Sequence, residues 1–359
     1  MILYDHHLMT YYTVMLWTAE LLSEHVTTRV ASLEWIGMAH EKDPMAMDKY
    51  ILTLLPALLG TLSDTDDEVV LLSLQVLASI SFYKKQFLRV LNSLVVLFEE
   101  DRALLETRGA LVIRKLCVLL DSRSIYLSLS DILNTLTQLD FVSQMVQTLN
   151  LLLLTAPELI SLRKSLKNCF DGSSGYIGNK TLKPEQEKTV NDNNTTDNSV
   201  NNDNNNSNNS NSNNENNDNR NDVVDTKNES LRITTKGLDA EQYYSDVDVF
   251  TSLFNCWSHN SVATFSLCLL AQAYDLSAQL ISRFADVDVT VGFLMQVDKL
   301  VQLLESPIFI HLRLQLLEVT APRHYDLLKS LYGLLMVSVC ACVFVCVCLC
   351  ACIYIYRYV

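Results

Sequence analysis

The chain has 359 residues, 49% of them hydrophobic, and a formal net charge of −14 at pH 7. That hydrophobic fraction can fill a sizeable core, and the length has room for two domains or one long repeat array. The acidic excess argues against a nucleic-acid-binding protein, because a phosphate-binding surface needs clustered lysine and arginine. Composition alone therefore favours a folded cytosolic protein with no nucleic-acid partner.

The cysteines are unevenly distributed, because six of the ten lie within the last twenty residues. Scattered thiols are typical of small buried side chains in a reducing compartment and not of a disulfide framework. The scattered ones are Cys117, Cys169, Cys256 and Cys268. Residues 1–10 carry charged and polar side chains, so they do not predict a signal segment, and we expect the sequence to begin inside a larger protein.

Apolar-periodic runs recur along the first half of the chain. Runs that begin at Val30, Val69 and Gly109 start 39 and 40 residues apart. A period near 40 with two helices per unit is typical of HEAT and armadillo arrays. The sequence therefore predicts an all-α fold, with a HEAT/armadillo-like α-solenoid of helical hairpins over residues 1–170. A non-repeating helical bundle is the alternative.

One repeat unit shows the expected order of helix, capped turn and helix. A leucine-rich helix is predicted over 54–62. Asp64 and the acidic turn after it are expected to cap a second helix that starts at Glu68, because carboxylates bind the free N–H groups at a helix start. A further helical pair is predicted over 125–136 and 141–154.

The composition changes abruptly over residues 171–245. Asparagine occupies 18 of the 31 positions from 191 to 221. Such a stretch has no apolar surface to offset the entropy of ordering, so we predict a disordered Asn-rich linker. About 70 flexible residues have an r.m.s. span of roughly 45 to 50 Å, which lets the flanking parts pack together. We interpret the linker as an expanded loop within one solenoid.

Short amphipathic helices follow one another from residue 246 to residue 336. Apolar residues at positions i, i+3, i+4 and i+7 line one face of the first helix, and they are Phe250, Leu253, Phe254 and Trp257. A second stripe runs from Phe293 to Leu304. Stripes of this width are buried against neighbouring helices, so we predict a C-terminal helical assembly domain over 246–336.

The tail over residues 337–359 is anomalous. The stretch from Leu331 to Tyr356 has 26 residues without a charge, which is long enough to cross a bilayer as a helix. Alternating Val-Cys followed by Ile-Tyr-Ile-Tyr is also what translated dinucleotide repeats look like. We interpret the tail as a gene-model artefact, an unspliced intron. A tail anchor, which would make the protein a helical membrane adaptor, is the alternative.

No catalytic, cofactor or metal site is expected. Cys256 and His259 form a Cys-x-x-His pair, but structural zinc needs four ligands and no second pair has the spacing. Gly-rich phosphate loops and Cys-x5-Arg loops do not occur. Polar residues within the apolar C-terminal runs are expected on a solvated face, with partner binding as the alternative. The candidate partner-binding residues are Trp257, His259, Asp298, Lys299 and Arg313.

Three C-terminal segments carry a resemblance to a known family: FTSLFNCWSHNSVATFSLCLLAQAY (250–274), DVDVTVGFLMQVDKLVQLLESPIFIHLRLQLLEV (286–319) and LLKSLYGLLM (327–336). They resemble the C-terminal region of the ArPIKfyve family, the vacuolar scaffold of the PIKfyve lipid-kinase complex. Three earlier segments resemble the HEAT repeats just before that region: TRVASLEWI (28–36), LLGTLSDTDDEVVLLSLQVLASI (58–80) and LLETRGALVIRKLCVLL (104–120).

The resemblance implies a scaffold that is not an enzyme, on the cytoplasmic face of endosomal, vacuolar or lysosomal membranes. Family members hold a PIKfyve-type phosphatidylinositol 3-phosphate 5-kinase together with a Sac-domain 5-phosphatase. They thereby control phosphatidylinositol 3,5-bisphosphate, and their membrane association is peripheral, through partners. Their C-terminal region forms a homo-oligomer and receives the phosphatase, a role that maps onto residues 246–336 here.

This sequence departs from the family pattern in four ways. The N-terminal array, where the kinase is expected to bind, is absent. Gly292 stands where the family usually has an acidic residue, and glycine inside a helix costs about 1 kcal/mol relative to alanine. The Asn-rich insertion is unusual, and after Met336 the family continues with further helix.

Overall fold

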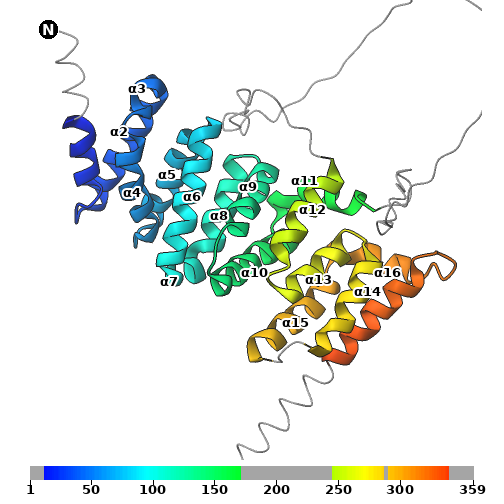
Figure 1. Ribbon diagram of the computed structural model, residues 1–359. Helices are drawn as coiled ribbons and strands as arrows, with labels where there is room; N and C mark the ends of the chain where they lie inside the picture. Colours follow the sequence, from blue (N-terminus) through cyan, green and yellow to red (C-terminus); the bar gives the residue numbers. More distant parts are fainter. Residues whose placement is uncertain (1–11, 171–244, 287–289, 339–359) are drawn as a thin grey trace, which may run out of the picture. The chain divides into compact units, whose positions relative to one another are not determined.

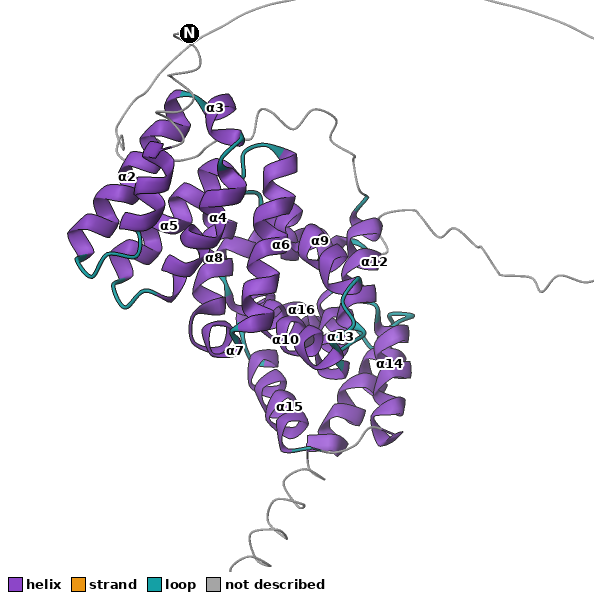
Figure 2. Cartoon of the chain, turned by 60° about the vertical axis from the view of Figure 1, so that its left-hand side comes forward, coloured by secondary structure: helices purple, strands orange, loops and turns teal. Residues whose placement is uncertain are grey.

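The computed structural model describes residues 12–170, 245–286 and 290–338, and every regular element in these ranges is a helix, as Figure 2 shows. The predicted all-α fold is therefore confirmed for the described residues, while its HEAT-like detail stays a prediction. Nearly all of the predicted linker (171–245) and of the anomalous tail (337–359) lies outside them.

Residues 12–20 and 324–338 are helical at the two ends of the described chain. Between them lie α2 (Val26–Lys42), α3 (Pro44–Asp48), α4 (Ile51–Gly60), α5 (Asp67–Ile80), α6 (Lys84–Glu100), α7 (Arg102–Leu104), α8 (Ala110–Leu119), α9 (Ser122–Asn134), α10 (Leu139–Thr155), α11 (Ile160–Asn168), α12 (Asp246–Trp257), α13 (Ser261–Leu270), α14 (Tyr274–Arg283), α15 (Val291–Leu304) and α16 (Ile310–Gln315). Short turns η1 (Thr61–Ser63), η2 (Leu105–Gly109), η3 (Pro157–Leu159), η4 (Phe284–Asp286) and η5 (Pro307–Phe309) join some of them.

Alternate helices stack on one another in two layers. One layer passes from α4 to α6, α9 and α12, and the other from α2 to α5, α8, α10, α13 and α15 (Figure 1). Each helix can bury an apolar stripe on both neighbours in its layer and on the opposite layer, as α10 does with Phe141, Met145 and Leu149. The core is thus continuous along the stack and not divided into separate centres.

The acidic turn before α5 is built differently from the prediction. The helix starts at Asp67, and the side chain of Asp66 caps it by accepting a hydrogen bond from the N–H of Glu68 at 2.9 Å. Asp64 is not the cap. Its carboxylate instead accepts from the N–H of Asp66 at 2.9 Å and turns toward Arg29 of α2. An aspartate in a turn can satisfy either role, and the arginine across the interface decides which one it takes.

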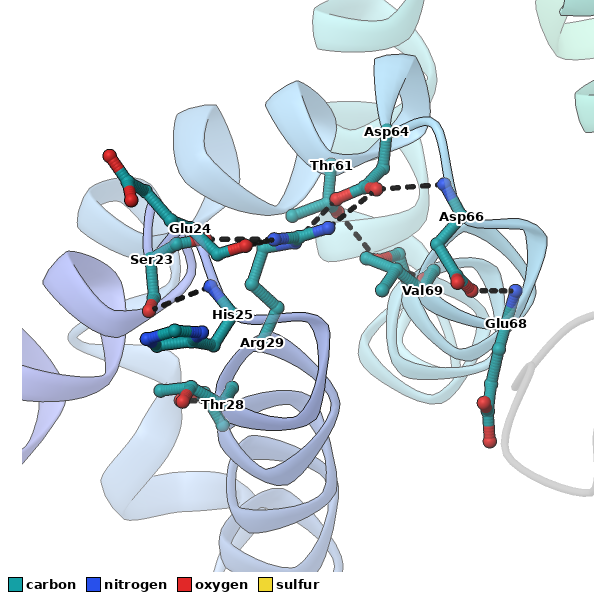
Figure 3. A network of polar contacts seen from close by, with 12 residues as sticks. Ser23, Glu24, His25, Thr28, Arg29, Thr61, Asp64, Asp66, Glu68 and Val69 are labelled. Carbon is teal, nitrogen blue, oxygen red and sulfur yellow. Dashed lines mark hydrogen bonds and ion pairs between the residues drawn. The ribbon is translucent and has the colours of Figure 1, made fainter.

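Arg29 joins the first repeats through the polar network of Figure 3. Its Nε lies 2.7 Å from Asp64 Oδ2, and its Nη1 donates to the carbonyls of Ser23 and Glu24 at 2.8 and 3.1 Å. Burial acts to raise the pKa of Asp64, but hydrogen bonds from Arg29 and from backbone N–H groups outweigh it and hold that pKa below its ordinary value. The ion pair therefore stabilises the fold above about pH 4 and is lost as pH falls through the lowered pKa.

The helices on either side of the Asn-rich stretch contact each other directly. Cys169 Sγ donates to the carbonyl of Asp246 at 3.0 Å, and the rings of Phe170 and Phe250 meet edge to face with centroids 4.9 Å apart. The residues that the structure describes all belong to one compact unit. The exact limits of the predicted segments stay a prediction.

No single helix among the described residues is long and apolar enough to cross a membrane. Residues 139–155 and 157–168 pass that test only as a pair, across a bend of 83°. Both members also bury apolar side chains in the helical core, as Leu153 and Leu166 do.

Candidate partner-binding groove

A groove of about 420 Å³ lies along the second layer, where α10, α13 and α15 meet. Its α10 wall presents one helical face, with Gln147, Asn150, Leu151 and Leu154. Val262 and Ala263, from the first turn of α13, also line it. The remaining lining residues all come from α15, and they are Met295, Gln296, Asp298, Lys299, Leu300 and Leu303.

The α15 wall follows from the stripe that the sequence predicts. Thr290 caps this helix by accepting a hydrogen bond from the N–H of Phe293 at 3.1 Å, and Phe293, Val297 and Leu300 are buried in the core. Packing of that stripe places the intervening positions outward. Met295 is 68% exposed, so an apolar side chain stands at the groove in contact with solvent.

Asn150 connects the groove to the core behind it. Its Oδ1 accepts a hydrogen bond from the indole Nε1 of Trp257 at 3.2 Å, and Ser266 Oγ lies 2.9 Å from the same oxygen. An indole N–H can only donate, so the amide oxygen must be the atom that faces Trp257. The amide nitrogen of Asn150 is therefore directed away from the indole, on the groove side.

A second amide holds the start of α13 against α10. The Nδ2 of Asn260 donates to Ser143 Oγ at 3.2 Å, while its Oδ1 caps α13 by accepting from the N–H of Ala263 at 2.9 Å. Asn260 is buried, and both ends of its amide are satisfied. The groove therefore rests on rigid helix ends.

The structure places the five predicted site residues in different surroundings. Asp298 and Lys299 are exposed and lie together at the groove. His259 is exposed just beyond the end of α12. Trp257 is wholly buried, so a direct contact with a partner is not open to it, and its part in the groove is to hold Asn150.

Arg313 lies on an exposed part of α16 and serves the turn before it. Its Nη1 donates to the carbonyls of Leu304 and Ser306 at 2.8 and 3.3 Å. Sequence reasoning missed the three amides at the groove, Gln147, Asn150 and Gln296. Their only signal was a polar side chain interrupting an apolar helical run, which a solvated face explains equally well.

The cysteines of the folded part carry unreactive thiols. Burial raises the pKa of Cys256 to about 12, and the pKa values of the Cys117, Cys169 and Cys268 thiols are raised to the same value, chiefly by burial. They stay protonated at neutral pH. Cys256 is buried while His259 is exposed, and no group of three or more potential metal ligands occurs among the described residues.

Comparison with protein families gives one matching model, described as the C-terminal region of vacuolar protein 14 that binds a partner protein. It matches residues 102–178 and 220–345, more than half of the chain and all of α10, α13 and α15. The chain belongs to this family. The family match thus covers every wall of the groove, together with all five candidate partner-binding residues.

Curated relatives agree with the family. The chain is 36% identical to Protein VAC14 homolog of Arabidopsis thaliana over 319 residues, 89% of this chain and 33% of the relative. It is 33% identical to Protein VAC14 homolog of Schizosaccharomyces pombe (88% and 30%) and 26% identical to vacuole morphology and inheritance protein 14 of Saccharomyces cerevisiae (89% and 28%). The chain spans about a third of the length of these relatives. No solved structure matches it.

Proposed function

We propose that this chain is the partner-binding end of a non-catalytic scaffold that assembles phosphoinositide enzymes. Its partner at this end is a Sac-domain phosphoinositide 5-phosphatase, held together with a PIKfyve-type phosphatidylinositol 3-phosphate 5-kinase. The complex controls phosphatidylinositol 3,5-bisphosphate on the cytoplasmic face of endosomal, vacuolar or lysosomal membranes. Membrane association is peripheral and comes from the partners.

The observation that carries this proposal is the coincidence of the family match with the groove. The matched region is named for binding a partner protein, and it contains both long walls of the groove, α10 and α15. A stacked helical scaffold with rigid walls and an exposed apolar side chain such as Met295 suits protein binding better than chemistry. The inert, buried thiols agree with a role that needs no nucleophile.

Co-purification tests the proposal. The full chain, expressed with the Sac-domain phosphatase, should retain the phosphatase through affinity and size-exclusion steps at physiological salt. The kinase, added as a third component, should join only if this third of the scaffold carries enough of its binding surface. Failure of the phosphatase to bind would refute the proposed function.

Self-association is the second part of the proposal, and an apolar stripe at the end of the described chain supports it. The large apolar side chains exposed on the last helix are Tyr325, Leu328, Tyr332, Leu335 and Met336. Leu314 and Leu317, exposed by 58% and 78%, continue the patch just before it. A contiguous exposed patch of this kind marks a protein-interaction surface. Leu314→Lys with Leu317→Lys should lower the solution mass measured by light scattering, whereas Leu22→Lys, at another exposed leucine, should not.

A tail-anchored membrane adaptor is the second candidate, favoured by the uncharged run from Leu331 to Tyr356. The two candidates separate by fractionation of cells that express the full chain or the chain cut after Met336. An anchor predicts that only the full chain resists extraction from membranes by high salt and carbonate. Equal extraction of both chains supports the scaffold.

A further inference from the structure

We propose that the groove between α10 and α15 binds a short extended segment of the phosphatase and recognises its main chain through side-chain amides. The inference deepens the proposed function and rests on it. Gln147, Asn150 and Gln296 would supply the hydrogen bonds, and the apolar side chains beside them would hold one bulky apolar residue of the segment.

The first argument is the fixed orientation of Asn150. Its oxygen is committed to the indole of Trp257, whose N–H cannot accept a hydrogen bond. The amide nitrogen is left with two N–H donors on the groove side, and no partner for it occurs within the described part of the chain. A peptide carbonyl is the acceptor that a neutral N–H donor of this kind fits without the desolvation cost of a charge.

The second argument is that the two other amides are also free. Among the described residues, neither Gln147 nor Gln296 makes a side-chain hydrogen bond, although they line opposite walls, one on α10 and one on α15. Each carries donors and an acceptor, so the pair can bind N–H and C=O groups alike. Amides on both walls match an extended backbone, which presents these groups on both edges.

The third argument is size. Gln147 and Leu154 lie seven residues apart on α10, which at 1.5 Å per residue gives a wall about 10 Å long. A helix with side chains is about 10 Å across, so that length of helix occupies on the order of 800 Å³, about twice the volume of the groove. An extended chain rises about 3.3 Å per residue, so roughly three residues fit. The dimensions therefore favour an extended segment over a helix.

The fourth argument concerns charge. Asp298 and Lys299 stand side by side in the lining and cancel in formal charge, and Asp298 Oδ2 already accepts from Gln302 at 2.7 Å. Recognition by neutral amides and apolar contacts predicts binding that changes little with salt, because screening acts on charges. Docking driven by a charged patch predicts a steep salt dependence.

The experiment uses the full chain and peptides of 15 residues tiled across the phosphatase sequence, with a second set tiled across this chain's own sequence. The test variant is Gln147→Met with Gln296→Met, which keeps side-chain length and removes both amides. The matched control is Gln75→Met, at an exposed glutamine of α5, a helix that does not line the groove. Affinities come from fluorescence polarisation at two salt concentrations, and intact phosphatase is tested in parallel.

At least one phosphatase peptide is expected to bind the wild-type chain. The double variant should weaken it roughly tenfold to a hundredfold, as expected for two lost hydrogen bonds. The control should stay within twofold, and salt should have little effect.

Three outcomes would overturn the inference. If intact phosphatase binds wild type and double variant equally, or no peptide depends on the two glutamines, the groove is not the site while the proposed function stands. A peptide of this chain's own sequence in the groove would show the occupant to be wrong. If intact phosphatase fails to bind the wild-type chain, both proposals fall.

Discussion

Two helix–helix turns in this chain, at residues 155–163 and 305–313, are built on the same plan but lie in different surroundings. Both follow the pattern Pro-x-x-Ile-x-Leu-Arg, and in both the proline opens a short 3-10 turn. The arginine then donates from Nη1 to two carbonyls at the end of the preceding helix, Arg163 at 2.8 and 2.7 Å and Arg313 at 2.8 and 3.3 Å. Each guanidinium thereby satisfies carbonyls that a helix end leaves free.

The difference lies in what covers each turn. α12 and α13 pack on α11 after the first turn, and Arg163 is only 8% exposed. Arg313 is exposed, and Leu314 follows it into solvent where the first turn has Lys164. Local sequence therefore decides the conformation of the turn, whereas the next helices in the stack decide its burial and its energetic weight.

Removing the cover of the first turn should have the largest effect. Trp257→Ala empties the space between α9 and α12 and frees Asn150 on α10, so we expect the free energy of unfolding to fall by about 3 to 5 kcal/mol. Trp257→Phe keeps most of the ring and loses the hydrogen bond, and should cost clearly less. Urea unfolding followed by circular dichroism measures both. A loss below about 1 kcal/mol for the alanine variant would mean that the first turn does not depend on this cover.

The two arginines should separate next. Arg163→Ala leaves two buried carbonyls without their charged donor and should cost about 2 to 4 kcal/mol. Arg313→Ala exposes its carbonyls to water, which replaces the donor, and should cost about 0.5 to 1 kcal/mol. Lys164→Ala, an exposed change beside Arg163, is the control for both in the same urea experiment. Equal losses at the two arginines would contradict the role given to burial.

The shared turn also marks where sequence reasoning succeeded and where it stopped. Periodicity found the helices because an apolar stripe such as Phe250, Leu253 and Trp257 must be buried, and these three are. The repeat search worked at a spacing near 40 residues, so it passed over a seven-residue pattern that recurs after 150. That signal was present in the sequence and could have been found.

The groove could not be found in the same way. Its walls are 150 residues apart, and Asn150 gains its meaning only from Trp257, which is 107 residues away along the chain. Asp64 taught the same lesson on a smaller scale. Its turn was predicted correctly as acidic and capped, but a partner on α2, Arg29, gave the capping role to Asp66. Long-range partners decide what a polar residue does when local sequence allows two roles.

The two turns should also differ in their response to pH. His311 of the second turn stands where the first has Ser161. Burial lowers the pKa of His311, and the charge of Lys167 lowers it further against the opposing carbonyls of Leu269 and Ile308. Below about pH 6.5 the unfolded chain therefore takes up a proton that the folded chain refuses, so stability falls as pH falls.

His311→Ser should flatten this dependence between pH 7 and pH 5, when unfolding free energies are measured across that range. Part of the slope should remain, because burial also lowers the pKa of His40 despite the nearby charges of Glu41 and Asp48. His259→Ser, at an exposed histidine, is the control. An unchanged slope in the His311 variant would show that its protonation is not linked to folding.

The smallest effect is expected where the helices that precede the two turns begin. α10 has Asp140 as its second residue, whereas α15 has Gly292 there and no acidic residue in its first turn. A Cβ added at Gly292 would meet only Thr290 Oγ1, at 3.9 Å, so a side chain fits. Gly292→Asp should stabilise the chain by about 0.5 to 1 kcal/mol, because the side chain removes backbone freedom from the unfolded state and the carboxylate favours the positive end of the helix dipole.

Gly292→Lys separates the two causes, since it adds the same Cβ with the opposite charge. The lysine variant should gain less than the aspartate variant at low salt, and the difference should shrink at high salt, where screening weakens the dipole interaction. Thermal unfolding at both salt concentrations measures this. Equal gains for aspartate and lysine would assign the whole effect to the backbone, and the lack of an acid in α15 would then explain nothing about the difference between the two hairpins.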